Sequence, residues 1–317
     1  MITKSSKIGV TSRTFCRSQK LRDLLEKDFS NVTYNDDGIH FDNESLVSFL
    51  GDCDAAIVSG ENLSKEIIDQ LPKLKIVSKF GVGLDGIDTS YLEEKDIKLA
   101  WKPGINSTSV AELALCYLIL LLREADSLNR DLISGVWSKV KNSRDLSEST
   151  IGIIGYGQIG RRLSNFLEAH ETRILVYDPF LDSSRATTSN IEIVELNFLL
   201  KESDAITLHL PLSENTKHMI SDSEINMMKK DSVIINLSRG GIVDEEALYS
   251  ALVNNRIAGA AIDVFELEPG NNPKLVSLSN VFATPHIAGT SRSASRMLGL
   301  SAINGLVESI NNEGDTE

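Results

Sequence analysis

The sequence contains little of several features that define specialised protein classes. Its three cysteines, Cys16, Cys53 and Cys116, are too widely spaced for a disulfide framework or a cysteine-based metal site. All three lie in or beside apolar stretches, which predicts thiols of a reducing compartment, a cytoplasmic location and no bound metal. The most apolar run, residues 113–122, is shorter than the roughly 20 residues of a membrane-spanning helix. The N-terminus shows no signal-peptide pattern.

An excess of positive charge is also lacking. Lysine and arginine number 32 against 45 aspartates and glutamates, a net charge of −13, and the basic residues are scattered along the chain. Nucleic acids and anionic membranes require a basic face, so the composition argues against both as partners. A small anionic ligand remains compatible, provided that its positive contacts are local.

What the sequence does contain is a regular alternation of apolar strands and amphipathic helices. In the first hundred residues the expected strands are 7–11, 55–59, 74–78 and 97–101, and the expected helices are 18–29, 44–50, 64–70 and 89–94. A long helix follows at 106–123. This alternation predicts a parallel sheet with helices on both faces.

A second alternating set predicts a second sheet. Its expected strands are 150–154, 173–177, 191–194, 205–210, 232–237, 258–264 and 281–283, and a last helix spans 291–311. We therefore expect an α/β protein with two doubly wound parallel-sheet, Rossmann-like domains and a cleft between them. The predicted boundaries assign residues 1–102 plus 290–317 to one domain and 103–289 to the other.

A glycine-rich turn opens the second set. Gly155, Gly157 and Gly160 form a G-x-G-x-x-G pattern between a predicted strand and a helix, where a pyrophosphate can approach the helix N-terminus. The next strand ends at Asp178, which can accept hydrogen bonds from a ribose 2′-hydroxyl and would repel a 2′-phosphate. The pattern therefore favours NAD over NADP. A methyltransferase can also place an acid at this position, so the loop alone does not exclude that class of protein.

Three later strands each end in one polar residue. Arg239 follows residues 232–237, an acid (Glu266 or Glu268) follows 258–264, and His286 follows 281–283. Ligands of such sheets bind at the carboxyl ends of the strands, so we expect these side chains to meet. An arginine, a histidine and a carboxylate beside a nucleotide loop fit hydride transfer to a ketone.

Several longer motifs carry a family resemblance. In order they are KFGVGLDGID at 79–88, PGINSTSVAELA at 103–114, GYGQIG at 155–160, LHLPLSENT at 208–216, NLSRGGIVD at 236–244, DVFELEP at 263–269 and TPHIAG at 284–289. With these motifs the chain resembles the D-isomer-specific 2-hydroxyacid dehydrogenases, and among them the phosphoglycerate dehydrogenase-like members without a regulatory domain. The resemblance covers nearly the whole chain.

The resemblance implies a catalytic set of Arg239, Glu268 and His286. Glu268 is chosen over Glu266 because the family's acid directly precedes the proline. Arg239 would bind the substrate or polarise its carbonyl, His286 would exchange the proton, and Glu268 would favour and orient the imidazolium. The implied reaction is the reversible reduction of a small anionic 2-oxo acid by NADH to a D-2-hydroxy acid.

The resemblance also implies the binding residues and a homodimer. The expected substrate contacts are Lys79, Val82, Gly83 and Arg239, where the two glycines of the segment 80–83 let backbone N–H groups approach a carboxylate. The expected cofactor contacts are Gly155, Gly157, Gln158, Ile159, Gly160, Asp178, Leu210, Pro211, Ser238, Arg239, Asp263, His286 and Gly289.

One departure and one alternative bear on function. Phosphoglycerate-specific members often carry an arginine after the strand that matches 55–58, where this sequence reads Ser59-Gly60-Glu61. A phosphorylated substrate is therefore less expected than an unphosphorylated one, unless Lys79 or Lys102 takes the place of that arginine. The alternative function is an NAD-sensing interaction protein of the corepressor type on the same fold, since fold alone does not fix activity.

Overall fold

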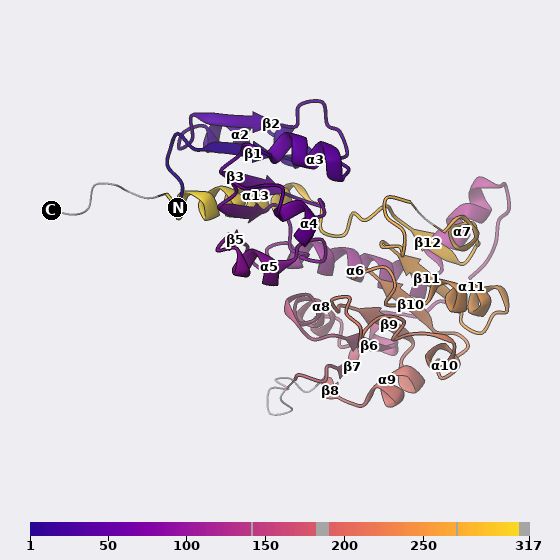
Figure 1. Ribbon diagram of the computed structural model, residues 1–317. Helices are drawn as coiled ribbons and strands as arrows, with labels where there is room; N and C mark the ends of the chain where they lie inside the picture. The colour runs from indigo at the N-terminus through magenta and orange to yellow at the C-terminus, as the bar shows by residue number, and fades with distance from the viewer. Residues whose placement is uncertain (141, 182–189, 271, 311–317) are drawn as a thin grey trace. The chain divides into compact units, whose positions relative to one another are not determined.

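The computed structural model describes residues 1–140, 142–181, 190–270 and 272–310 (Figure 1). The chain forms two compact units, unit 1 with Met1–Asn106 and Thr290–Glu317, and unit 2 with Ser107–Gly289. The division after Asn106 falls four residues beyond the predicted boundary at 102. The predicted end of the last helix, Asn311, lies outside the described residues.

Unit 1 is built on a five-stranded parallel sheet in the order β2-β1-β3-β4-β5. Its strands are β1 (Lys7–Val10), β2 (Asn31–Tyr34), β3 (Ala55–Val58), β4 (Ile76–Lys79) and β5 (Lys98–Ala100). Strands β3 and β4 are buried along their whole length, as expected for a sheet covered on both faces. The edge strand β2, with partly exposed side chains, was not predicted from the sequence.

The helices of unit 1 lie on both faces of that sheet. They are α1 (Arg13–Cys16), α2 (Gln19–Leu25), α3 (Asn43–Leu50), α4 (Lys65–Ile68), α5 (Thr89–Glu94) and α13 (Arg292–Val307). The last helix, α13, returns from unit 2 to pack against β4, β5 and α2. Ser78 on β4 donates to the carbonyl of Ala302 on α13 at 2.7 Å, which holds this returning helix on the sheet.

Unit 2 contains a seven-stranded parallel sheet in the order β12-β11-β10-β9-β6-β7-β8. Its strands are β6 (Thr150–Ile154), β7 (Arg173–Tyr177), β8 (Ile191–Ile193), β9 (Ala205–Leu208), β10 (Val233–Asn236), β11 (Gly259–Ile262) and β12 (Val281–Ala283). All pairings are parallel, so all carboxyl ends reach one edge. The predicted α/β class with two parallel sheets is thereby confirmed.

The helices of unit 2 cover both faces of the larger sheet. They are α6 (Ser107–Leu122), α7 (Ala125–Ile133), α8 (Gln158–Glu168), α9 (Leu196–Glu202), α10 (Asp222–Ile225), α11 (Glu245–Val253) and α12 (Pro273–Val276). Helix α6 packs against α8, β10 and β11 and buries Ala114, Tyr117 and Leu118. Because side chains alternate along a strand, Ile153 joins the core under α6 whereas Ile154 joins the core on the other face.

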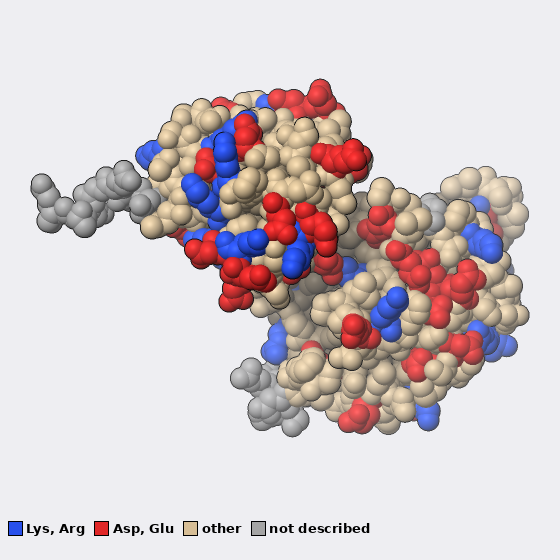
Figure 2. All heavy atoms as spheres, viewed as in Figure 1, with Lys and Arg blue, Asp and Glu red and all other residues tan. Residues whose placement is uncertain are grey.

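The surface carries both signs of charge. Figure 2 shows lysine and arginine side chains interspersed with aspartate and glutamate on the visible face. Within the described residues, no helix combines the length and the apolar character that a membrane crossing requires.

Candidate active site

Three adjacent parallel strands deliver the predicted catalytic residues to one edge of the unit 2 sheet. Strands β10, β11 and β12 pair in register, so the segments that leave their carboxyl ends lie side by side (Figure 1). Arg239 follows β10, Glu268 follows β11 and His286 follows β12. The sheet order therefore accounts for the meeting of residues that are far apart in sequence.

His286 and Glu268 form a direct pair. The Nδ1 atom of His286 lies 2.6 Å from Oε2 of Glu268, and the other carboxylate oxygen accepts the backbone N–H of Phe265 at 2.8 Å. Half of the His286 side-chain surface is exposed. Because Nδ1 faces the carboxylate, Nε2 on the opposite side of the ring is the nitrogen that can exchange a proton with a ligand.

The pair shifts both pKa values toward the charged forms. The hydrogen bond to Glu268 raises the pKa of His286 above its ordinary value, against burial, and the charges of Glu268 and Asp263 add to this increase. Burial alone would raise the pKa of Glu268, but the hydrogen bonds from His286 and from the Phe265 N–H hold it below its ordinary value. The structure thus favours an imidazolium next to a carboxylate.

Arg239 is the third member of the group. Its guanidinium is half-buried and donates through Nη1 to the carbonyl of Ser238 at 2.7 Å. Its charge lowers the pKa of Glu268 and also opposes the increase in the pKa of His286, so it acts on both members of the pair. The three residues form a cluster with one permanent positive charge and one titratable proton donor.

The backbone at His286 is held in an unusual conformation. Its φ of 53° lies in the left-handed region, which costs a non-glycine residue about 1 kcal/mol or more. The His286 N–H donates to the carbonyl of Asp263 at 2.8 Å. The fully buried carboxylate of Asp263 accepts the N–H groups of Ile287 and Ala288, each at 2.8 Å, so Asp263 fixes the loop that carries His286.

The glycine loop lies between β6 and α8 at the same edge. A side chain at Gly160 would meet the carbonyl oxygen of Gly155 at 2.3 Å, so α8 can approach β6 only with glycine there. At Gly157, the N-cap of α8, nothing lies within 4 Å of the position of a Cβ. That open space over a helix N-terminus suits a pyrophosphate group.

Asp178 directly follows β7, the strand next to β6, and therefore lies at the same edge as the glycine loop. Its Oδ2 accepts the N–H of Tyr156 at 2.8 Å and its Oδ1 the N–H of Phe180 at 3.0 Å. Each oxygen retains a further lone-pair direction for a ribose hydroxyl. The residues present therefore fit a dinucleotide with an unphosphorylated ribose.

The other predicted cofactor residues lie beyond the same strand ends, Gln158 and Ile159 in the first turn of α8 and the others on loops. Ser238 is buried and donates to the side-chain oxygen of Asn236, which shapes the turn before Arg239. The remaining positions range from half-buried to exposed and follow β6, β9 and β12; they are Gln158, Ile159, Leu210, Pro211 and Gly289. Their contacts with a cofactor stay predictions.

The predicted substrate residues Lys79, Val82 and Gly83 lie in unit 1. Lys79 ends β4 and is buried, and its ammonium donates to the carbonyl of Ser59. The carboxylate of Glu61 accepts the N–H of Ser59 at 2.6 Å, so an acid lies in the loop that Lys79 supports. The carbonyl of Val82 accepts the indole N–H of Trp101 at 2.8 Å.

Two residues that support the loop carrying His286 were not found by sequence reasoning. The hydroxyl of Thr284 donates to Asp263, and the hydroxyl of Tyr117 on α6 lies 2.6 Å from that of Thr284. Thr284 belongs to the TPHIAG motif and carried a detectable signal. Tyr117 carried none, because it lies 167 positions away in the sequence, within the apolar stretch 113–122.

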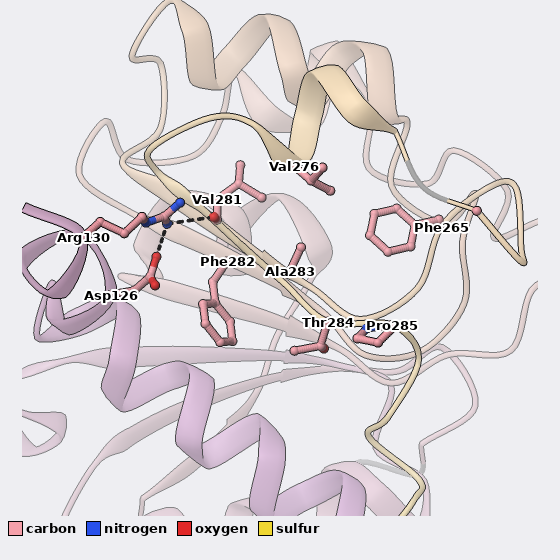
Figure 3. Close-up of a pocket in the computed structure, with 10 residues that line it drawn as sticks. Asp126, Arg130, Phe265, Val276, Val281, Phe282, Ala283, Thr284 and Pro285 are labelled. Atoms are coloured by element: carbon pink, nitrogen blue, oxygen red, sulfur yellow. Dashed lines mark hydrogen bonds and ion pairs between the residues drawn. The ribbon is translucent and has the colours of Figure 1, made fainter. Parts of the chain in front are cut away.

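A cavity of about 410 Å³ flanks β12 next to this loop (Figure 3). It is lined mainly by apolar side chains, including Phe265, Phe282 and Pro285. Among the described residues that line it, the cation is Arg130 of α7, which pairs with Asp126 and donates to the carbonyl of Val281. The arginine therefore anchors the edge strand to α7 and offers no obvious anion site.

Comparisons with known proteins find a matching family profile and related sequences and structures. The profile described as "D-isomer specific 2-hydroxyacid dehydrogenase, NAD binding domain" matches residues 115–288. A hydroxypyruvate reductase of Thermotoga maritima is 36% identical over 293 residues, covering 89% of this chain and 95% of the relative.

Two further proteins extend the comparison. A D-3-phosphoglycerate dehydrogenase of Methanocaldococcus jannaschii is 36% identical over 259 residues, 81% of this chain, but the match spans only 49% of that longer protein. The solved structure of a D-lactate dehydrogenase from Aquifex aeolicus, complexed with NAD and lactic acid, has a TM-score of 0.82 and 26% identity, covering 95% of this chain and 94% of that chain.

Proposed function

The chain belongs to the D-isomer specific 2-hydroxyacid dehydrogenase family and is an NAD-dependent oxidoreductase of the CH–OH group; we propose that its substrate is a short, unphosphorylated 2-oxo acid of the hydroxypyruvate or glyoxylate type. The observation that carries the assignment of 2-oxo acid reduction to this site is the His286–Glu268 pair, at 2.6 Å, with Arg239 acting on both partners.

Each residue of the cluster has a distinct task in the proposed reaction. When bound, the nicotinamide supplies the hydride that reduces the carbonyl carbon. Arg239 binds the substrate carboxylate or carbonyl through its guanidinium fork. His286 donates the Nε2 proton to the carbonyl oxygen as it becomes a hydroxyl, and recovers it in the reverse direction. Glu268 holds the ring by Nδ1 and stabilises its charged form.

The preference for an unphosphorylated substrate is supported by unit 1. In the loop that follows β3 the chain carries Glu61, whose carboxylate hydrogen-bonds within that loop, and the nearby Lys79 ammonium donates to Ser59. This loop therefore carries an acid where phosphoglycerate-specific members often carry an arginine, and a carboxylate does not bind a second anionic group. The hydroxypyruvate reductase of Thermotoga maritima matches over 95% of its length, whereas the phosphoglycerate dehydrogenase of Methanocaldococcus jannaschii matches over only 49% of its length.

A substrate screen tests the proposal. NADH oxidation should be measured with glyoxylate, hydroxypyruvate, pyruvate and 3-phosphohydroxypyruvate. We expect turnover of at least one unphosphorylated acid and a kcat/KM for the phosphorylated one that is lower by at least about tenfold, the cost of roughly 1.4 kcal/mol of transition-state binding. Turnover of the phosphorylated acid alone would reverse the substrate assignment.

A variant separates enzyme from binding protein. Arg239→Ala should abolish turnover while changing NADH affinity little, because its side chain is assigned to the substrate and Arg239 is only one of many expected cofactor contacts. Binding of NADH without turnover of any 2-oxo acid by the unaltered protein, across the pH range, would favour the alternative of an NAD-sensing interaction protein.

We also propose a cytoplasmic homodimer. The end of α7 and the residues after it expose an unusual set of large apolar side chains, with Ile133 78% and Trp137 84% exposed. Leu132, Val136 and Val140 are also more than half exposed. An apolar patch of this kind on a protein surface marks an interaction site, and a second copy is the proposed partner. The cytoplasmic location is supported by three free thiols, two of them buried.

A further inference from the structure

The carboxylate of Asp263 is the hub of the loop that carries His286. It is fully buried at the end of β11, and it accepts the Thr284 hydroxyl and the N–H groups of Ile287 and Ala288. A buried carboxylate requires such donors, since an unsatisfied one costs several kcal/mol. The position of the His286 loop therefore depends on these three hydrogen bonds to the Asp263 carboxylate.

The hydroxyl of Thr284 can serve Asp263 only because it has another partner. A threonine hydroxyl has one hydrogen, and here that hydrogen is donated to the acceptor-only carboxylate. The contact of 2.6 Å between the hydroxyls of Tyr117 and Thr284 must then be donated by Tyr117. The hydrogen bonds run in one direction, from Tyr117 through Thr284 to Asp263.

Packing fixes the geometry of this relay. Tyr117 is 1% exposed, and its ring meets that of Phe282 edge-to-face, with centroids 5.2 Å apart. Figure 3 shows Phe282 and Thr284 on one face of β12, opposite Val281 and Ala283. Tyr117 of α6 therefore makes two contacts directly before the His286 loop. Its ring packs on Phe282 of β12, and its hydroxyl bonds to Thr284, the residue that follows β12.

We infer that Tyr117 is a positioning residue for His286, acting through Thr284 and Asp263 on the loop that orients the imidazole toward Glu268. The inference rests on the proposed role of His286 as proton donor. The charged groups that face His286 are Glu268, Asp263 and Arg239, and the relay ends on one of them. Loosening it would let the loop leave its left-handed conformation and lengthen the contact between His286 and Glu268.

Two substitutions remove single hydroxyls from the relay. Tyr117→Phe keeps the ring packed on Phe282 but loses the donor, and Thr284→Val keeps the side-chain shape but loses the link. We expect each to lower kcat for 2-oxo acid reduction by about tenfold, the scale of a small misplacement of a catalytic group. The KM for the acid should change less than about twofold, because Arg239 lies outside the relay.

The pH profile distinguishes positioning from simple stabilisation. In both variants the pH at which reduction declines should move downward, because a longer His286–Glu268 contact removes the main cause of the raised pKa of His286. Thr284→Ser retains a hydroxyl and should restore both kcat and the profile. The Tyr117→Phe/Thr284→Val double variant should be no slower than Thr284→Val alone, since the two act in one chain.

The matched control is Tyr91→Phe in unit 1. Tyr91 is also buried and also donates to an aspartate, Asp69, at 2.6 Å, but it has no part in the relay. It should leave kcat and the pH profile unchanged. If Tyr117→Phe and Thr284→Val lower only the melting temperature, with normal kcat and profile, Tyr117 has no positioning role. If Tyr117→Phe does not fold, the Val and Ser variants of Thr284 decide the question.

His286→Gln separates this inference from the proposed function. Turnover that survives this substitution would remove His286 as the proton donor and the function proposed for the site. Turnover that is lost with His286→Gln but normal in the relay variants would reject the relay alone.

Discussion

At the level of single residues, the site depends on a hydrogen bond that joins two titratable groups. His286 and Glu268 contact each other at 2.6 Å, and each shifts the pKa of the other toward the charged form. Reduction requires the protonated, charged form of His286 as the proton donor, and oxidation requires the neutral form to accept a proton. The two directions of the reaction should therefore respond to pH with opposite sign.

This contrast gives a pH prediction. The rate of reduction should be high while His286 is protonated and should fall as the pH rises through its raised pKa, above the ordinary value of about 6.5. The rate of oxidation should rise over the same interval. Glu268→Gln should move both transitions to lower pH, because it removes the largest cause of the raised pKa. Rates of both reactions as a function of pH measure this.

Glu266→Gln is the control for the charge change. Glu266 lies two residues away, but its carboxylate pairs with His218 at 3.2 Å rather than with His286. Its substitution should leave the pH transitions in place. A profile that moves equally with either glutamate would contradict the assignment of Glu268.

At the level of elements, the turn from β6 into α8 separates the needs of the fold from those of the ligand. Gly160 lets the helix lie against the strand, whereas Gly157 leaves open space at the helix N-terminus. Both glycines belong to one sequence motif, but the protein itself leaves no room for a side chain only at position 160.

Two alanine substitutions test this division. Gly160→Ala should destabilise unit 2 by about 1–3 kcal/mol through the clash with the Gly155 carbonyl, and should weaken NADH binding. Gly157→Ala should leave the melting temperature nearly unchanged, because its Cβ meets no atom within 4 Å, yet should still weaken NADH binding. Thermal unfolding and NADH titration measure the two effects. Equal losses of stability in both variants would be incompatible with this account.

Two of the elements that sequence patterns missed are short or exposed. Strand β2 spans Asn31–Tyr34 at the sheet edge with partly exposed side chains, so its apolar alternation is weak. Helix α7 spans Ala125–Ile133 and buries none of its residues, so no apolar face marked it as a core helix. Strands β6, β7 and β12 began and ended at the predicted residues because their apolar runs stop at polar or turn residues.

At the level of the whole molecule, net charge and exposed apolar surface point to different partners. A net charge of −13 opposes binding to polyanions, so a small anion would have to bind through local positive groups such as Arg239. The apolar side chains at the end of α7, by contrast, favour a protein partner, because large exposed apolar patches are rare on isolated subunits.

Oligomeric state provides the prediction at this scale. The Ile133→Glu/Trp137→Glu double variant should sediment as a monomer, because charges in an apolar interface prevent its burial. Val253→Glu, a similar change at an exposed apolar position at the end of α11, should sediment like the unaltered protein. Sedimentation velocity measures both. A double variant that is dimeric would place the interface of the proposed dimer elsewhere.

The sequence by itself determined which residues reach the edge of the sheet. Arg239, Glu268 and His286 follow three apolar strands, and neighbouring parallel strands must end together, so their convergence followed from the pattern. Tertiary structure alone decided where side chains point and what supports them. The ammonium of Lys79 faces the carbonyl of Ser59, and Tyr117 reaches Thr284 across 167 positions. Such contacts depend on how helices pack on the sheet, which local spacing along the chain does not encode.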